Sequence, residues 1–241
     1  MVWVDGNHEA FEFGHNLRLS SASCAARSSS DCGALQPRTP PSAGSSAPDQ
    51  PGLLPANVHY VGGGRTFRHG GVLFTGACAW WNWDFCAPER EPGAARAHFA
   101  AVAKSQGWFA EVPEKGDAPI EETVEQLAGE EFEALAAAVR EGEQDASISR
   151  IVVVTHTVPH RSLLEKGIYP VELLDAAFYG NSRMEGLATE GAGAPKLALW
   201  VYGHSHSGAS SRIGGVRYES NPRGRPDDFN RAAYAPRLLT V

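Results

Sequence analysis

The fold is decided by two stretches, Ile151-Val152-Val153-Val154-Thr155-His156 and Leu197-Ala198-Leu199-Trp200-Val201-Tyr202-Gly203-His204. Each is a continuous apolar run that ends in polar residues, which is typical of a strand buried on both faces of a parallel sheet. Ahead of the first run, residues 121–140 repeat apolar side chains at helical spacing, with acidic residues between them. Strands that alternate with helices predict a layered α/β fold.

Other elements follow from shorter patterns. A strand end at residues 2–4, a strand at 58–61 and a hairpin over 65–76 are predicted, and residues 92–108 form a weaker helix pattern. Final strands are predicted at 212–218 and 237–241. Between them, Trp80, Trp81 and Trp83 occupy a loop after a strand. They either line a pocket or pack against a helix, and packing is slightly favoured.

Length and composition predict a single domain over residues 1–241, interrupted by a disordered insertion. The chain has 241 residues, of which 42% are apolar, enough for a sizeable core. Residues 20–52 are dominated by Ser, Ala, Pro and Gly and nearly lack large apolar side chains. Such a segment buries too little surface to offset its ordering entropy.

Charge and hydropathy exclude several classes of protein. The net charge of -7 argues against a general affinity for nucleic acid. No apolar run reaches the length of a membrane span, and the N-terminus does not resemble a signal peptide. The four cysteines lack a paired CxxC spacing and are typical of a reducing compartment. The sequence therefore predicts a cytoplasmic protein without a membrane partner.

Three predicted strands end in residues that can bind a metal. Asn7 and His8 follow the first strand, His156 follows a second, and His204 and His206 follow a third. Ligands of α/β sheets sit at the carboxyl ends of the strands, so these side chains are expected to converge. Imidazole and amide oxygen suit a divalent metal such as Mn, Fe or Zn.

These motifs resemble those of a known family. Gly6-Asn7-His8-Glu9, the strand leading to His156, and Gly203-His204-Ser205-His206 are similar to the later motifs of the calcineurin-like metallophosphoesterases. The resemblance implies a four-layer α/β/β/α sandwich that uses two metal ions. It also implies hydrolysis of a phosphomonoester or phosphodiester by a metal-bound hydroxide.

The resemblance assigns a role to each matching residue. Asn7, His156 and His204 would ligate one metal and His206 the other, while His8 would protonate the leaving group without ligating. Asn181-Ser182-Arg183-Met184 and Asn221-Pro222-Arg223-Gly224 also resemble recurrent segments of such proteins. Arg183 and Arg223 are therefore candidate contacts to a phosphate-ester substrate, since a guanidinium can hold two phosphate oxygens. Surface turns are an equal alternative for both segments.

The chain departs from the family pattern at its start. That pattern opens with Asp-x-His and Gly-Asp-x-x-Asp, and no Asp-x-His occurs in this sequence. The resemblance then implies a sandwich that lacks its first strands and the carboxylate bridging the metals. Since closely spaced dications repel unless carboxylates compensate, at most one metal is expected and activity is expected to be impaired.

Two alternatives remain open at the level of sequence. In the first, the chain is an inactive remnant or a non-catalytic binding module with the same fold. In the second, it is a mononuclear hydrolase of amides or carboxyl esters that uses Asn7, His156 and His204 around zinc. The sequence leaves the substrate, the identity of the metal and the oligomeric state undetermined.

Overall fold

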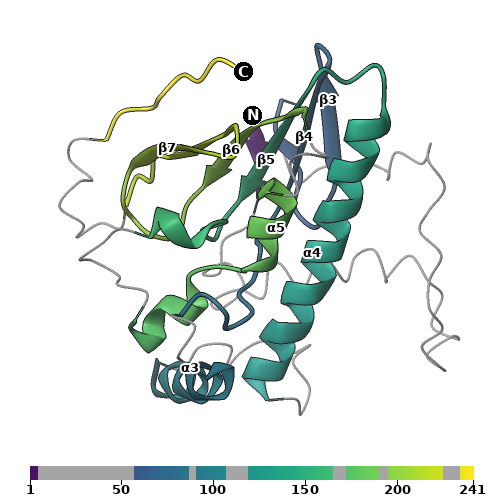
Figure 1. The fold of residues 1–241 in the computed structure, drawn as a ribbon. Helices are drawn as coiled ribbons and strands as arrows, with labels where there is room; N and C mark the ends of the chain where they lie inside the picture. The colour runs from purple at the N-terminus through teal and green to yellow at the C-terminus, as the bar shows by residue number, and fades with distance from the viewer. Residues whose placement is uncertain (5–56, 87–90, 107–118, 165–171, 190–194, 225–233) are drawn as a thin grey trace, which may run out of the picture.

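The computed structural model describes residues 1–4, 57–86, 91–106, 119–164, 172–189, 195–224 and 234–241. The insertion predicted at 20–52 lies outside these ranges. The described part is a mixed α/β fold around a six-stranded sheet (Figure 1). The strands of that sheet are β3 (Thr66–His69), β4 (Val72–Ala77), β5 (Arg150–Thr155), β6 (Leu197–Tyr202), β7 (Ala209–Ile213) and β8 (Val216–Ser220).

The four central strands of this sheet run parallel. The spatial order is β3-β4-β5-β6-β8-β7, with β4, β5, β6 and β8 parallel to their neighbours. The two edge strands, β3 and β7, are antiparallel. The apolar runs at β5 and β6 therefore occupy the centre, where a strand is covered on both faces and alternation of polar residues is lost. The strands predicted from these two runs are confirmed.

Helices cover one face of the sheet. Helix α4 (Ile120–Gln144) buries a stripe that includes Val124, Leu135 and Val139, as its helical spacing predicts. Gly142 of this helix faces the side chains of Leu73 and Ile151. The short helix α5 (Arg183–Thr189) lies on the same face, and α3 (Pro92–Gln106) lies across the first turns of α4 (Figure 1).

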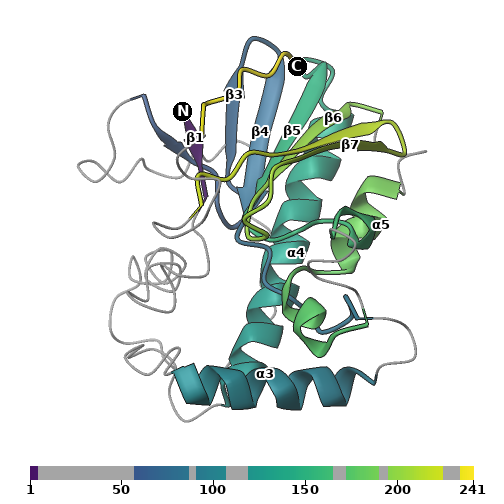
Figure 2. The same ribbon diagram turned by 90° about the vertical axis from the view of Figure 1, so that its left-hand side faces the viewer.

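A second, two-stranded sheet lies on the other face. It pairs β1 (Val2–Trp3) with β2 (His59–Tyr60) in parallel. The His59 ring stacks on Phe67 of β3 with centroids 3.7 Å apart, and Val4 lies close to Gly76 of β4. Because successive side chains of a strand point to opposite faces, Gly76 points away from the face that Leu73 presents to α4. The small sheet thus packs over the β3–β4 end of the large one (Figure 2).

The C-terminal part of the chain differs from its prediction. Residues 212–218 do not form one strand, because Gly214 and Gly215 adopt φ values of 55° and 89° and turn the chain into the β7–β8 hairpin. Residues 237–241 form no strand. Instead Arg237 lies 3.2 Å from the carboxylate of Glu219.

Glu219 organises the outer face of this hairpin. Its side chain is almost fully buried and accepts hydrogen bonds from Ser210 and Arg217. Burial alone would raise the pKa of this carboxyl, but the two hydrogen bonds and the nearby arginine charges lower it. The carboxylate therefore stays ionised and holds the hairpin and the C-terminal segment together.

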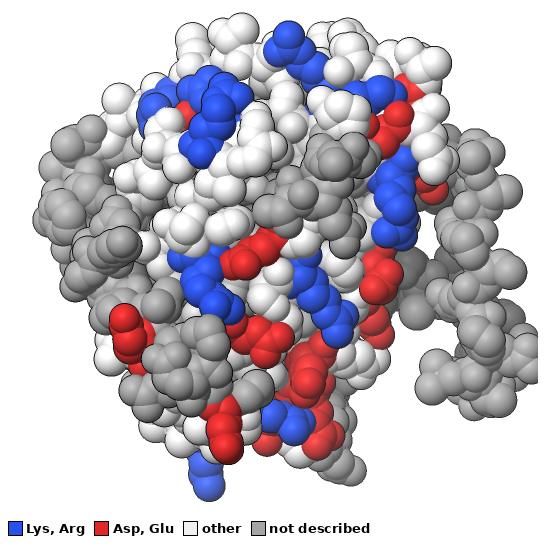
Figure 3. Space-filling view, in the orientation of Figure 1, with Lys and Arg blue, Asp and Glu red and all other residues white. Residues whose placement is uncertain are grey.

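The surface carries charges of both signs. The face drawn in Figure 3 mixes basic and acidic side chains, and acidic ones gather toward its lower end. Glu121 and Glu122 lie in the first turn of α4, where they complement the helix dipole. In the part of the chain that the structure describes, no helix combines the length and apolar character that crossing a membrane requires.

The close approach of β4 to its neighbours is testable at Gly76. A methyl group at Gly76 would meet the carbonyl oxygen of Val154 on β5 and the side chain of Val4. Gly76→Ala should therefore lower the free energy of unfolding in urea by about 1–3 kcal/mol. Gly93→Ala is the control, because nothing lies within 4 Å of a Cβ there and stability should hold or rise. Equal effects of the two substitutions would contradict this packing.

Candidate functional site

The candidate site lies at the carboxyl edge of the large sheet. His156 directly follows β5, and Gly203 and His204 directly follow β6. The backbone continues to pair beyond the strands: the His156 amide donates to the Ala77 carbonyl at 3.3 Å, and the Gly203 amide donates to the His156 carbonyl at 2.9 Å. The register of the parallel strands therefore sets two histidines, 48 residues apart in sequence, at the same level.

The two imidazoles face each other. Nδ1 of His204 lies 3.1 Å from Nε2 of His156, the ring centroids are 5.1 Å apart, and both side chains are half-buried. Two nitrogens that ligate one metal at about 2.0–2.1 Å lie roughly 3.0–3.4 Å from each other. The observed separation fits two ligands of a single ion. It equally fits a hydrogen bond in which one neutral ring donates to the other.

The loop after β6 has an unusual backbone. His204 and His206 have φ values of 66° and 56°, the left-handed region that residues other than glycine seldom adopt. The Ser205 amide donates to the Gly203 carbonyl at 2.8 Å, which closes a tight turn between the two histidines. Strain of this kind is concentrated at functional sites, where the surrounding structure maintains it.

The remaining predicted ligands are only partly placed. Asn7 and His8 lie outside the described residues, so their roles stay predictions. His206 follows His204 in the same turn and is half-buried. Across the described ranges, no group of three or more His, Cys, Asp or Glu side chains is arranged to hold a metal. The structure thus brings His156 and His204 together and leaves the rest of a ligand set undefined.

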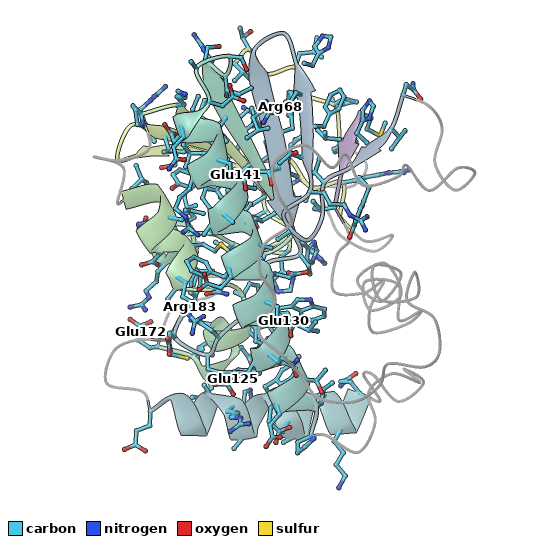
Figure 4. All side chains as sticks on the ribbon, turned by 90° about the vertical axis from the view of Figure 1, so that its right-hand side faces the viewer. Arg68, Glu125, Glu130, Glu141, Glu172 and Arg183 are labelled. Atoms are coloured by element: carbon cyan, nitrogen blue, oxygen red, sulfur yellow. The ribbon has the colours of Figure 1, made fainter. Side chains whose placement is uncertain are left out.

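The two candidate arginines occupy different places. Arg223 is exposed and follows Ser220, the last residue of β8, by three positions, so it lies on the same edge as the histidines. The guanidinium of Arg183, in contrast, lies over the Phe132 ring, 5.8 Å from its centroid. Figure 4 shows Arg183 at the end of α5 that adjoins α4. Its side chain packs on that helix rather than beside the facing imidazoles.

The three tryptophans are core residues. Trp80, Trp81 and Trp83 are at most 3% exposed and cluster with side chains of α3 and α4, which confirms packing against helices. The side-chain amide of Asn181 donates to the Trp80 carbonyl at 3.0 Å and to the Ala128 carbonyl at 3.3 Å, tying this loop to α4. The cluster nevertheless reaches the site, because the Trp81 ring lies 6.0 Å from that of His204.

Buried hydroxyl groups connect the strand ends. Trp200 Nε1 donates to the Thr155 hydroxyl at 2.9 Å, and that hydroxyl donates to the Thr157 carbonyl at 2.9 Å. The Thr157 hydroxyl donates to the Ala79 carbonyl, while the Ala79 amide donates to the Glu131 carboxylate at 2.7 Å. The loop after β4 and the residues on each side of His156 are thus fixed to one another and to α4.

Sequence reasoning missed two residues near the site. Tyr179 packs against His204 with ring centroids 4.8 Å apart, and Glu131 holds the Ala79 amide. Neither belongs to a recognisable motif. The segment Asn181-Ser182-Arg183-Met184, which begins two residues after Tyr179, is the nearest signal that drew attention to this part of the chain.

Comparisons with known proteins relate the chain to a solved structure. No protein-family model matches the chain, and no curated protein shows significant sequence similarity to it. Among solved structures, the chain is similar to a phosphopantetheinyl hydrolase from Mycobacterium tuberculosis, with a TM-score of 0.55. The match covers 95% of this chain and 71% of the other at 17% sequence identity. At this identity the match shows a shared mixed α/β fold.

This finding corrects the family assignment made from the motifs. The structure that the chain matches carries the name of a phosphopantetheinyl hydrolase, not of a calcineurin-like metallophosphoesterase, and no family model supports the assignment. The physical reason is that short motifs after strands report the local chemistry of a sheet edge. That chemistry recurs on unrelated proteins and does not by itself identify a family.

Backbone strain at His206 is testable by comparing two substitutions at one position. Because φ is 56°, His206→Gly should be more stable than His206→Ala by about 0.5–1 kcal/mol in urea unfolding. At the exposed strand residue Ser211 the order should reverse, since glycine there only adds freedom to the unfolded chain. Equal stability of the alanine and glycine variants at position 206 would show that the left-handed backbone is not maintained.

Proposed function

We propose that the chain is a hydrolase that cleaves a phosphate ester at the edge where His156 and His204 meet. The observation that carries the proposal is the 3.1 Å separation of their facing nitrogens at the carboxyl ends of adjacent parallel strands. Ligands of open α/β sheets bind at that edge. The fold shared with a phosphopantetheinyl hydrolase adds support.

The substrate class follows from the same comparison. A phosphodiester is the favoured substrate, with a phosphopantetheinyl group as the first candidate, because the matched structure is named for its hydrolysis. Arg223 lies on the edge of the sheet that carries the histidines and is exposed, so it can hold phosphate oxygens. Arg183, which stacks on Phe132, is the weaker candidate for this contact.

A divalent metal fits the histidine pair. His156 and His204 would hold it, with Asn7 as a further ligand, whereas His206 alone would not hold a second ion. Mn, Fe or Zn suits imidazole and amide donors. When bound, such an ion polarises the ester and lowers the pKa of water toward neutrality. At most one ion per chain is proposed, since no carboxylate among the described residues joins the pair to bridge two dications.

Residues of the chain would perform the remaining steps. His8 would give a proton to the departing oxygen, and Arg223 would orient the ester. The half-buried position of the histidine pair beside Trp81 and Tyr179 would limit access of bulk water. A four-layer arrangement also remains a proposal, with the two-stranded sheet as part of the second β layer.

Metal binding tests the ligand assignment directly. After dialysis against dilute zinc or manganese, elemental analysis should find no more than one ion per chain. His156→Ala and His204→Ala should each weaken binding by more than the roughly 10–100-fold typical of residues that only orient a ligand. His69→Ala, an exposed histidine of β3, is the matched control and should change nothing. If the unmodified protein and the three variants bound the metal with equal affinity, the proposed metal site would be refuted.

Turnover distinguishes the chemical classes. Metal-loaded protein should hydrolyse bis(4-nitrophenyl) phosphate, and His8→Ala should lower turnover by about 10²–10⁴-fold with metal content unchanged. 4-Nitrophenyl acetate is the comparison substrate. Hydrolysis of the acetate alone would indicate a carboxyl-ester hydrolase, and metal binding without any turnover would indicate a non-catalytic binding module. If His8→Ala lost bound metal and turnover to the same extent, the role of His8 as a proton donor would be refuted.

A further inference from the structure

The ring of Tyr179 packs against the imidazole of His204. Their centroids are 4.8 Å apart and the planes meet at 64°, whereas His156 and Trp81 lie 5.1 and 6.0 Å from His204. Tyr179 is half-buried and closes the short helix η3 (Leu174–Phe178) as its C-cap residue. A residue outside β6 and the loop that follows it therefore contacts the imidazole that the proposed function requires.

The backbone at Tyr179 is fixed to the loop that carries His156. The Tyr179 carbonyl accepts a hydrogen bond from the Val158 amide at 2.9 Å, and Val158 and Gly180 form a parallel bridge. Gly180 lies so close to the Val158 carbonyl and the Phe85 ring that no Cβ fits there. The backbone of Tyr179 is thus bonded to a residue only two positions after His156.

Helix η3 is fixed from its other side by α3. Asp175 pairs with His98 at 2.6 Å, and both side chains are partly exposed. Phe178 packs among rings of the tryptophan cluster, 5.7 Å from Phe99 and 6.2 Å from Trp81. A polar side-chain contact and an apolar contact together set the position of Tyr179.

We propose that Tyr179 is a positioning residue for His204. The left-handed backbone at His204 does not choose a direction for its ring, which needs neighbours to hold Nδ1 toward His156. The Tyr179 ring supplies that restraint, and the Asp175–His98 pair maintains the restraint from a distance. The consequence for metal affinity rests on the proposed function; the restraint on the ring does not.

The restraint is measured first in metal-free protein. Ring signals of isotope-labelled histidines report the environment of each imidazole, and the spectrum of His204→Gln identifies those of His204. In the unmodified chain they should form one set displaced from random-coil values by the neighbouring aromatic rings. Tyr179→Leu should move them toward random-coil values, while Tyr179→Phe, which keeps the ring, should leave them in place. Unchanged signals in Tyr179→Leu would overturn the proposal.

Metal affinity is the second readout, with zinc and cobalt as probes. Tyr179→Leu should weaken zinc binding about tenfold, the lower range for residues that orient a ligand, and Tyr179→Phe should restore it. The visible absorption of bound cobalt should change in the leucine variant alone, because it reports ligand geometry. Loss of affinity in both variants would point to the hydroxyl group instead and overturn the role of the ring.

A surface variant keeps the test valid if Tyr179→Leu fails to fold. Asp175→Asn replaces the carboxylate of a side chain that is 53% exposed and weakens its contact with His98. It should shift the His204 signals partway and weaken zinc binding about twofold. Combined with Tyr179→Leu it should add nothing, since both act through one contact. Additive effects would show that the Asp175–His98 contact does not act through Tyr179.

The two proposals fail in different ways. Displaced and single His204 signals in a chain that binds no zinc would refute the proposed metal site and support the positioning of His204. If Tyr179→Leu left the affinity for zinc unchanged, the positioning of His204 by Tyr179 would be refuted, whereas the proposed metal site would not.

Discussion

The parallel pairing of β5 with β6 is the constraint on which the rest of the structure depends. Val152 pairs with Leu199, Val153 with Trp200 and Val154 with Val201, and this register carries through to the hydrogen bond between the Gly203 amide and the His156 carbonyl. A shift of β6 by one residue would move Trp200 to the opposite face of the sheet and separate the two imidazoles. Burial of the core and formation of the site thus depend on one register.

That register is further secured by buried polar groups. Trp200 sits in the core of the helix-covered face, yet its indole nitrogen donates to Thr155, the residue immediately before His156. A buried hydrogen bond is expensive to leave unmade, so this pair penalises misaligned strands more than apolar contacts alone would. The same side chains that make the sheet apolar therefore also specify its alignment.

The sequence predicted the elements whose pattern is set by local chemistry. The runs at β5 and β6 and the helical spacing in α4 identified the centre of the fold. Two strand segments around the Gly70-Gly71 turn identified the β3–β4 hairpin. The prediction of a single strand over residues 212–218 was wrong because two glycines within this segment form the turn of a hairpin. The prediction of a strand over residues 237–241 was wrong because an ion pair with Glu219, rather than strand pairing, holds that segment.

The candidate site was accessible from sequence only where its residues follow strands. His156 and His204 end two apolar runs, so the rule for parallel sheets placed them together. Tyr179 and Glu131 do not end such runs, and no local pattern marks a residue that acts by contact with a distant loop. The family assignment failed for a related reason, because motifs of three or four residues describe one edge of a sheet while family membership is a property of the whole chain.

The site and the tryptophan cluster both depend on the position of Trp81. Trp81 is nearly fully buried, packs on Phe99 of α3 and Phe178 of η3, and also contacts His204. The packing of α3 against α4 and η3 therefore sets the environment of an imidazole that contacts the same indole. A volume change in that cluster would displace either the helix or the histidine, because a close-packed interior has no free space to absorb it. The loop after β4 is consequently both a structural core and the wall against which the candidate site is built.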